Sequence, residues 1–136
     1  MKVTVDANIL FSCLIKDAGT RKVFFNPSLS LFAPEFIVKE LLIHVQEVQK
    51  KSGLSDEDFS ILVEKVFSQL RLIKDKDLAP FLPAAATLIT DSKDWLYLAC
   101  ALREDSLLWS NDLGFKTQTR VKVMNTKEVI AIVGSL

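Results

Sequence analysis

The sequence predicts an α/β fold, a three-layer α/β/α sandwich with a central parallel β-sheet. Short apolar segments with the character of strands alternate along the chain with longer helix-like segments. This alternation is typical of a parallel sheet that helices cover on both faces. The chain has 136 residues, the usual size of one domain, so residues 1–136 are expected to form a single domain.

The expected strands are short and mostly apolar. In chain order they cover residues 2–5, 29–33, 70–74, 106–110 and 121–125. The segments between and after them show helical periodicity or helix-start signals. In chain order the expected helices cover residues 7–16, 19–26, 34–51, 55–69, 83–89, 91–104 and 126–134, the sixth beginning at Asp91 or Ser92.

Local signals set several of these boundaries. Pro34 suits the first position of a helix, where its missing N–H is not needed, and Gly53 is expected to end that helix. Ser55 and Asp58 resemble a capping box at the start of the next helix. Residues 75–83 carry charges and two prolines, so a loop is expected there.

Composition limits the classes of function. The chain has 17 basic and 17 acidic side chains, so a nucleic-acid partner would be held by local patches or through a metal ion. Cys13 and Cys100 lie in apolar segments and are expected to be buried free thiols in a reducing compartment. No secretory signal and no apolar run of about 20 residues is present, so a cytoplasmic location is expected.

Two acids are expected at one edge of the sheet. Asp6 directly follows the first strand, and Asn111 and Asp112 directly follow the strand at 106–110. In open parallel sheets, active sites lie beyond the carboxyl ends of the strands. Both carboxylates should therefore face the same edge, where they become candidates for a site.

Two further acids lie on helices beside apolar faces. Glu40 is at the edge of an apolar stripe and one turn before His44, so it can look into a cleft between helix and sheet. The stripe is formed by Ile37, Val38, Leu41, Leu42, Val45 and Val48. Asp94 lies on the side of Leu98 and Ala101 in a nearly all-apolar helix, where a carboxylate needs hydrogen bonds, a cation or an open cavity.

Each acid also has a simpler structural explanation. The alternatives are a helix cap for Asp6 or Asn8, a helix cap for Asp91, helix-dipole stabilisation for Asp94, a turn for Asp112 and a solvated helix face for Glu40. Taken together, however, four neighbouring carboxylates raise one another's pKa unless a positive charge lies between them. Mg²⁺ suits such oxygen ligands, whereas a single histidine and no Cys/His cluster disfavour zinc.

Four segments, in order along the chain, resemble the motifs of the PIN domain, the fold of many metal-dependent ribonucleases and of the VapC toxins. They are "VTVDANIL", "PEFIVKELL", "DSKDWLYLACAL" and "LLWSNDLGF", and the resemblance covers essentially the full length. It implies that Asp6, Glu40, Asp94 and Asp112 are the metal-binding and catalytic acids. Asn8, Ser110 and, less directly, Asp91 would support them by orienting a carboxylate or holding a water.

The resemblance implies a Mg²⁺- or Mn²⁺-dependent ribonuclease that hydrolyses RNA phosphodiester bonds, as a stand-alone nuclease or as the toxin of a toxin–antitoxin pair. The alternative is a PIN-like module that binds RNA or protein without cleaving. Receiver domains and haloacid-dehalogenase-type enzymes are disfavoured, because a single acid follows the first strand and Asn8 replaces the second acid of a D-x-D motif.

The partners implied are an RNA substrate, a second copy in a homodimer and, for a toxin, an antitoxin protein. Apolar residues off the main stripe of helix 34–51, Phe36 and Ile43, offer surface for such protein contacts. The chain lacks an arginine-rich surface, and the candidate phosphate contacts are Lys16, Arg21, Lys22, Lys116, Arg120 and Lys122.

Overall fold

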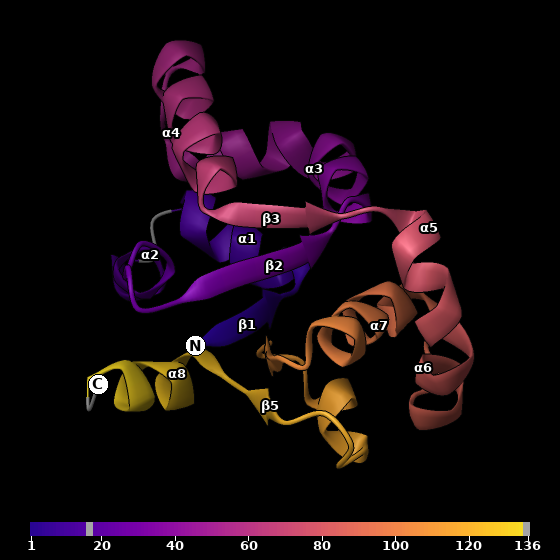
Figure 1. The fold of residues 1–136 in the computed structure, drawn as a ribbon. Helices are drawn as coiled ribbons and strands as arrows, with labels where there is room; N and C mark the ends of the chain where they lie inside the picture. The colour runs from indigo at the N-terminus through magenta and orange to yellow at the C-terminus, as the bar shows by residue number, and fades with distance from the viewer. Residues whose placement is uncertain (16–17, 135–136) are drawn as a thin grey trace.

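A computed structural model describes residues 1–15 and 18–134 and contains the predicted parallel sheet. The described strands are β1 (Lys2–Val5), β2 (Ser30–Pro34), β3 (Leu70–Ile73), β4 (Leu107–Trp109) and β5 (Val123–Met124). They lie in the order β3-β2-β1-β4-β5, and every pair is parallel (Figure 1). The predicted α/β class is therefore confirmed.

Helices cover both faces of the sheet. The described helices are α1 (Ala7–Ile15), α2 (Ala18–Phe24), α3 (Phe36–Ser52), α4 (Asp56–Ser68), α5 (Asp75–Leu78), α6 (Leu82–Leu88), α7 (Trp95–Glu104) and α8 (Thr126–Val133). The chain passes from β1 to the neighbouring strand β2 and from there to β3, in the same direction across the sheet. From β3 it crosses back over the sheet and forms β4 on the other side of β1. Right-handed crossovers then place α1–α4 on one face and α5–α7 on the other, as Figure 1 shows.

The core lies between these layers and holds the middle of the sheet in place. The β1 and β4 side chains Val3, Val5, Leu108 and Trp109 have no exposed surface. α7 packs against β1, β2 and β4, while α1 packs against α2, α3 and α4. Because both central strands are covered on both faces, the residues that follow them are held by a rigid support.

The two cysteines are buried and in no disulfide, as predicted. The Cys100 Sγ accepts a hydrogen bond from Thr4 Oγ1 at 3.6 Å, and burial raises the pKa of this thiol to about 12. A thiol with such a pKa is protonated at neutral pH and unreactive. Cys100 is therefore a packing residue of the core.

The prediction that Pro34 begins a helix is wrong. Pro34 is the last residue of β2, and α3 begins at Phe36. The Glu35 N–H donates to the Ile73 carbonyl of β3 at 2.8 Å, so the preceding nitrogen, that of Pro34, points toward the β1 side. Pairing with β1 ends at Phe32, so a residue without an N–H is tolerated at this point of β2.

The loop predicted at residues 75–83 is also wrong. This segment forms α5, a short 3₁₀ helix at Ala79–Phe81 and the beginning of α6. Pro80 and Pro83 lie at the first or second positions of their helices, where proline is tolerated because those N–H groups have no partner within the helix. The prolines therefore start helical segments here and do not break them.

Other boundary signals hold. Gly53 ends α3 in the left-handed conformation, with φ of 69°. The Ser55 side chain caps α4 by accepting from the Asp58 N–H at 3.1 Å. In the apolar stripe of α3, Leu42 is an exception, because 65% of its surface is exposed. Of the helices in the described residues, none combines the length and apolar character needed to span a bilayer.

Candidate functional site

The strand order reverses between β1 and β4, and the candidate site lies at the carboxyl ends of these two strands. Val5 at the end of β1 pairs with Trp109 at the end of β4, and the Asp6 N–H donates to the Trp109 carbonyl at 3.3 Å. Asp6 and Ser110 are the next residues on the two strands. Crevices at such a reversal are where open parallel sheets bind ligands.

Acidic side chains from four parts of the chain meet in a cavity of about 140 Å³ at this edge. All four acids singled out from the sequence line it, together with the predicted supporting residues Asp91 and Asn8. The lining is Asp6, Ala7, Asn8, Glu40, Asp91, Lys93, Asp94, Tyr97 and Asp112. The fold thus brings together residues that lie more than 100 positions apart in the sequence.

Asp6 both caps a helix and faces the cavity. Its side chain is 5% exposed; Oδ1 accepts from the Ile9 N–H at 2.9 Å, and Oδ2 accepts from the Ser110 hydroxyl. The cap of α1 is therefore Asp6 and not Asn8. Asn8 lies in the first turn of α1 and is exposed, and its side chain makes no hydrogen bond to another described residue.

Ser110 connects the acids that follow β1 and β4. Its hydroxyl donates to Asp6 and accepts from the Asp112 N–H at 3.0 Å. The Asp112 Oδ1 accepts in turn from the Gly114 N–H at 2.8 Å, which begins the 3₁₀ helix Leu113–Thr117. The Asp112 side chain is thus fixed by the local turn, and its other oxygen takes part in no hydrogen bond to a described residue.

Tyr97 holds Glu40 across the cavity, and sequence reasoning missed it. The Tyr97 hydroxyl donates to the Glu40 Oε1 at 2.5 Å, and the ring is buried. Burial and the neighbouring Glu40 raise the pKa of this hydroxyl far above its usual range, so it remains a donor. The sequence contained one signal for this role: Tyr97 lies three residues after Asp94, on the same helix face. The surrounding residues are apolar, however, and indicate a buried core helix.

Asp91 and Asp94 lie where α7 begins. The Asp91 Oδ1 caps the 3₁₀ turn Ser92–Asp94 by accepting from the Lys93 N–H at 3.1 Å, whereas Asp94 makes no side-chain cap hydrogen bond. Lys93 is the second residue that sequence reasoning missed. Among the described residues that line the cavity, it alone carries a positive charge. Its position between two site acids was the available signal.

Among the described residues that line the cavity, the carboxylates outnumber the single cation, Lys93. Burial raises the pKa of Asp6 to about 6, and Asp112 and Glu40 add to this by repulsion. Burial likewise raises the pKa of Asp94 to about 6, with repulsion from Asp91, Asp112 and Asp6. Perturbed carboxylates that converge on a cleft are typical of functional sites.

The donors in the cavity fit a hard divalent cation. They are carboxylate oxygens. Glu40 and Asp112 are each fixed by a hydrogen bond to one oxygen, and Asp6 accepts one on each oxygen, as ligands positioned by outer contacts commonly do. Over residues 1–15 and 18–134, no group of three such side chains already has ligating geometry. A cation would have to draw these carboxylates inward.

Of the predicted phosphate contacts within the described residues, those on α2 and near Asp112 do not line this cavity. Arg21 donates to the carbonyls of Cys13 and Leu14 at 2.6 and 3.1 Å and so caps the end of α1. Lys22 is exposed on α2. Lys116 pairs with Glu128 at 2.8 Å. Lys16 lies outside the described residues.

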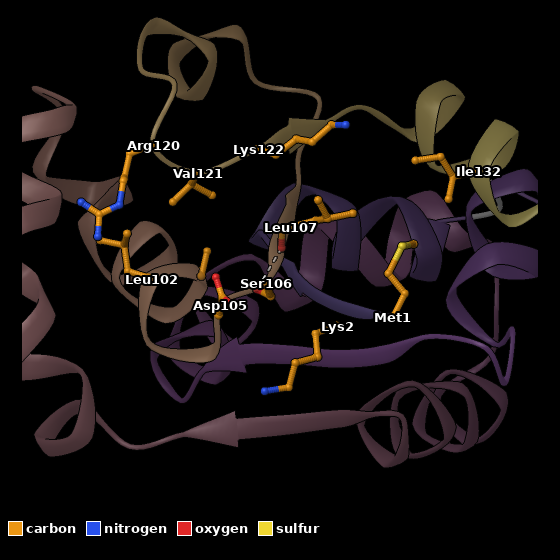
Figure 2. Close-up of a pocket in the computed structure, with 11 residues that line it drawn as sticks. Met1, Lys2, Leu102, Asp105, Ser106, Leu107, Arg120, Val121, Lys122 and Ile132 are labelled. Atoms are coloured by element: carbon orange, nitrogen blue, oxygen red, sulfur yellow. Dashed lines mark hydrogen bonds between the residues drawn. The ribbon is translucent and has the colours of Figure 1, made fainter.

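Arg120 and Lys122 lie at the opposite, amino edge of the sheet. There they line a larger hollow of about 630 Å³, beside the first residues of β1 and β4 (Figure 2). Figure 2 shows Arg120, Lys122 and Lys2 pointing in different directions, so these cations do not converge on one ligand. The chain runs from Asp112 back across the sheet before β5 begins, which carries both residues away from the acids.

Comparison with known proteins identifies the family. The PIN domain model matches residues 4–131. No curated protein matches the chain.

Two solved structures share the fold, each with a TM-score of 0.67. One is VapBC2 from Rickettsia felis bound to a DNA fragment from its promoter, at 19% identity, covering 92% of this chain and 98% of that one. The other is PAE2754 from Pyrobaculum aerophilum, at 15% identity, covering 100% of this chain and 91% of that one. With a match over nearly its whole length, this chain belongs to the PIN domain family, whose members are generally nucleases that use a divalent metal.

Proposed function

We propose that this protein is a Mg²⁺- or Mn²⁺-dependent ribonuclease that hydrolyses RNA phosphodiester bonds in the acidic cavity. The observation that carries the proposal is the convergence of Asp6, Glu40, Asp94 and Asp112 on one cavity at the reversal point of the sheet. Phosphodiesters are anionic and would be repelled by these acids alone. A site of this kind therefore makes chemical sense with a bound cation between protein and substrate.

Asp6, Glu40, Asp94 and Asp112 would hold the cation. A bound Mg²⁺ or Mn²⁺ would neutralise charge on the reacting phosphate and lower the pKa of the attacking water. Ser110 keeps the Asp6 carboxylate turned toward the cavity, and Tyr97 does the same for Glu40. Once a cation has drawn the acids inward, these contacts would hold Asp6 and Glu40 in place, so that little further reorganisation is needed in the transition state.

The protein groups also provide for proton transfer. In hydrolysis, water adds to phosphorus while a P–O ester bond breaks, the attacking water gives up a proton and the leaving oxygen gains one. A cavity carboxylate that the cation does not engage would accept the proton that the attacking water releases. Lys93 at the cavity wall adds a positive charge that can contact a phosphate oxygen.

A protein partner is the second part of the proposal. On α3, Leu42 and Ile43 are 65% and 74% exposed, which suits a contact with an antitoxin or with a second copy of this chain. One structural neighbour is a toxin–antitoxin protein, VapBC2. Co-expression with the product of a small adjacent gene would test the toxin role, and sedimentation analysis would test the homodimer. Failure to copurify such a product would favour a stand-alone nuclease.

The nuclease proposal is tested with purified protein and end-labelled single-stranded RNA. Wild type with Mg²⁺ or Mn²⁺ should cleave, and a chelator should stop cleavage. Asp94→Asn should lose activity, whereas Asp77→Asn on α5, an acid outside the cavity, should retain it. Equal cleavage by both variants would point to a copurifying nuclease and would refute the assignment. Metal binding without cleavage by wild type would favour the non-cleaving module.

A further inference from the structure

A second hollow adjoins the acidic cavity. It has a volume of about 450 Å³ and lies between α1 and α3. Its lining residues are Asn8, Phe11, Ser12, Ile15, His44, Glu47, Val48 and Lys51. Asn8 lines both this hollow and the acidic cavity, so the two spaces lie on either side of this residue at the start of α1. A chain-like ligand held at the acids therefore needs only to pass Asn8 to reach the hollow.

Two aromatic rings form a corner in this hollow. The ring centroids of Phe11 and His44 are 5.5 Å apart, and their planes are inclined by 65°. Phe11 is half-buried and packs against the core, which fixes its ring, while His44 is exposed on α3. Because the rings are edge to face, a third flat ring can lie against one of them without displacing the pair.

The charges of the hollow favour an uncharged flat group over a phosphate. Lys51 is paired with Glu47 at 2.9 Å, so these two side chains add no net charge. Asn8 and Ser12 offer donors and acceptors beside the rings. The hollow at the amino edge in Figure 2 does contain the basic residues Arg120 and Lys122, but it lies across the sheet from the acids. Aromatic rings with neutral polar groups are the features that single-stranded RNA sites use to bind bases.

We infer that the hollow between α1 and α3 binds a nucleobase of the RNA strand whose phosphate lies in the acidic cavity, by stacking on His44 and Phe11. The inference rests on the proposed function for the position of the phosphate. The base of the neighbouring nucleotide is then bound by stacking and by hydrogen bonds. Strand binding here should therefore depend less on salt than binding through phosphates does.

The test separates binding from cleavage. Fluorescence anisotropy is measured with a short labelled single-stranded RNA on Asp94→Asn protein in the presence of Mg²⁺, alone and combined with changes at His44. His44→Ala should weaken binding at least about fivefold, the effect of losing one stacked base contact. His44→Phe keeps a ring face and should restore most of the affinity. Gln46→Ala, also exposed on α3 but facing a different hollow, is the matched control and should bind as its parent does.

A second readout places the base directly. RNA containing 4-thiouridine, irradiated in complex with the Asp94→Asn protein, should crosslink to the peptides that contain Phe11 or His44. Unchanged affinity in His44→Ala, or crosslinks confined to other elements, would overturn the inference and leave the hollow to a peptide partner. Absence of RNA binding would overturn it as well. Crosslinks at His44 in a protein whose wild type never cleaves RNA would uphold the base site and refute the nuclease proposal.

Discussion

The two edges of the sheet differ in a way that identifies the site. The hollow at the amino edge is the larger, about 630 Å³ against about 140 Å³, and it contains the basic residues Arg120 and Lys122. Its charged side chains diverge, however, whereas the acids at the carboxyl edge converge and are held by Ser110 and Tyr97. Convergence of fixed polar groups with perturbed pKa values, and not the size of a hollow, therefore marks the candidate site.

The largest effect is expected for Asp6→Asn. This change keeps the size of the side chain and an oxygen that can cap α1, but removes the charge at the centre of the cavity. RNA cleavage should fall by about a hundredfold or more, the usual effect of removing a key electrostatic group. The measurement is the initial rate of cleavage with Mg²⁺, with circular dichroism as the control for folding. A rate within twofold of wild type would show that Asp6 is only a helix cap.

A smaller loss is expected for Tyr97→Phe. The change leaves the buried ring in place and removes only the hydrogen bond to Glu40. Removal of an outer contact to a metal ligand typically lowers metal affinity or activity by about 10- to 100-fold. Titration of the protein with Mn²⁺ should show weaker binding. Wild-type affinity together with a lower melting temperature would instead assign Tyr97 a purely structural role.

The effect on stability should depend on pH and be smaller again. The pKa of Asp94 is about 6 in the folded protein and near 4 when unfolded, so the folded state binds more protons between these values. Without metal, the free energy of unfolding should therefore fall as pH rises from about 4 to about 6 and stay low above it. Asp94→Asn should remove part of this pH-dependent loss of stability. Because Asp94 is half exposed, the free energy of unfolding of Asp94→Asn at pH 7.5 should exceed that of wild type by less than about 1 kcal/mol.

Thermal unfolding in the presence of a chelator measures this gain, and Asp77→Asn again serves as the control. A melting temperature for Asp94→Asn below that of wild type at pH 7.5 would contradict the picture of carboxylates that repel one another. Addition of Mn²⁺ should reverse the ranking, because only wild type then gains from the bound cation.

The smallest effect is expected at the amino edge. Arg120→Ala removes a cation that neither lines the acidic cavity nor converges with Lys122. The rate of RNA cleavage and the affinity for RNA should stay within about twofold of wild type, as expected for a surface charge remote from the site. A clear loss of RNA affinity would mean that the substrate reaches around the sheet and that the contrast between the edges is incomplete.

The sequence was sufficient to place Asp6 and Asp112 at one edge, because every parallel strand delivers its following residue to the same edge. Glu40 and Asp94 could be expected nearby from their positions beside apolar helix faces. Their approach to Asp6 depends on how α3 and α7 pack on opposite faces of the sheet, and sequence periodicity does not define that packing.

Other features depended on context that no local pattern contains. Tyr97 was hidden because a tyrosine inside an apolar helix reads as core until its hydroxyl is seen to reach Glu40. Arg120 was grouped with the site because it follows Asp112 closely in sequence, although the chain crosses the sheet between them. The predictions for Pro34 and for residues 75–83 were wrong because both relied on proline. Proline lacks a backbone N–H, and whether that N–H is needed depends on the neighbouring strand or on the position within a helix.

The most direct test of the central claim is calorimetric titration of Mn²⁺ into the metal-free protein at pH 7.5. Wild type should bind the ion, and Asp6→Asn and Asp94→Asn should each bind it at least tenfold more weakly, about the effect of disturbing a metal's ligands. Arg120→Ala should match wild type. No binding heat for wild type, or equal affinity in all four proteins, would show that the convergent acids do not form a metal site and would contradict the account.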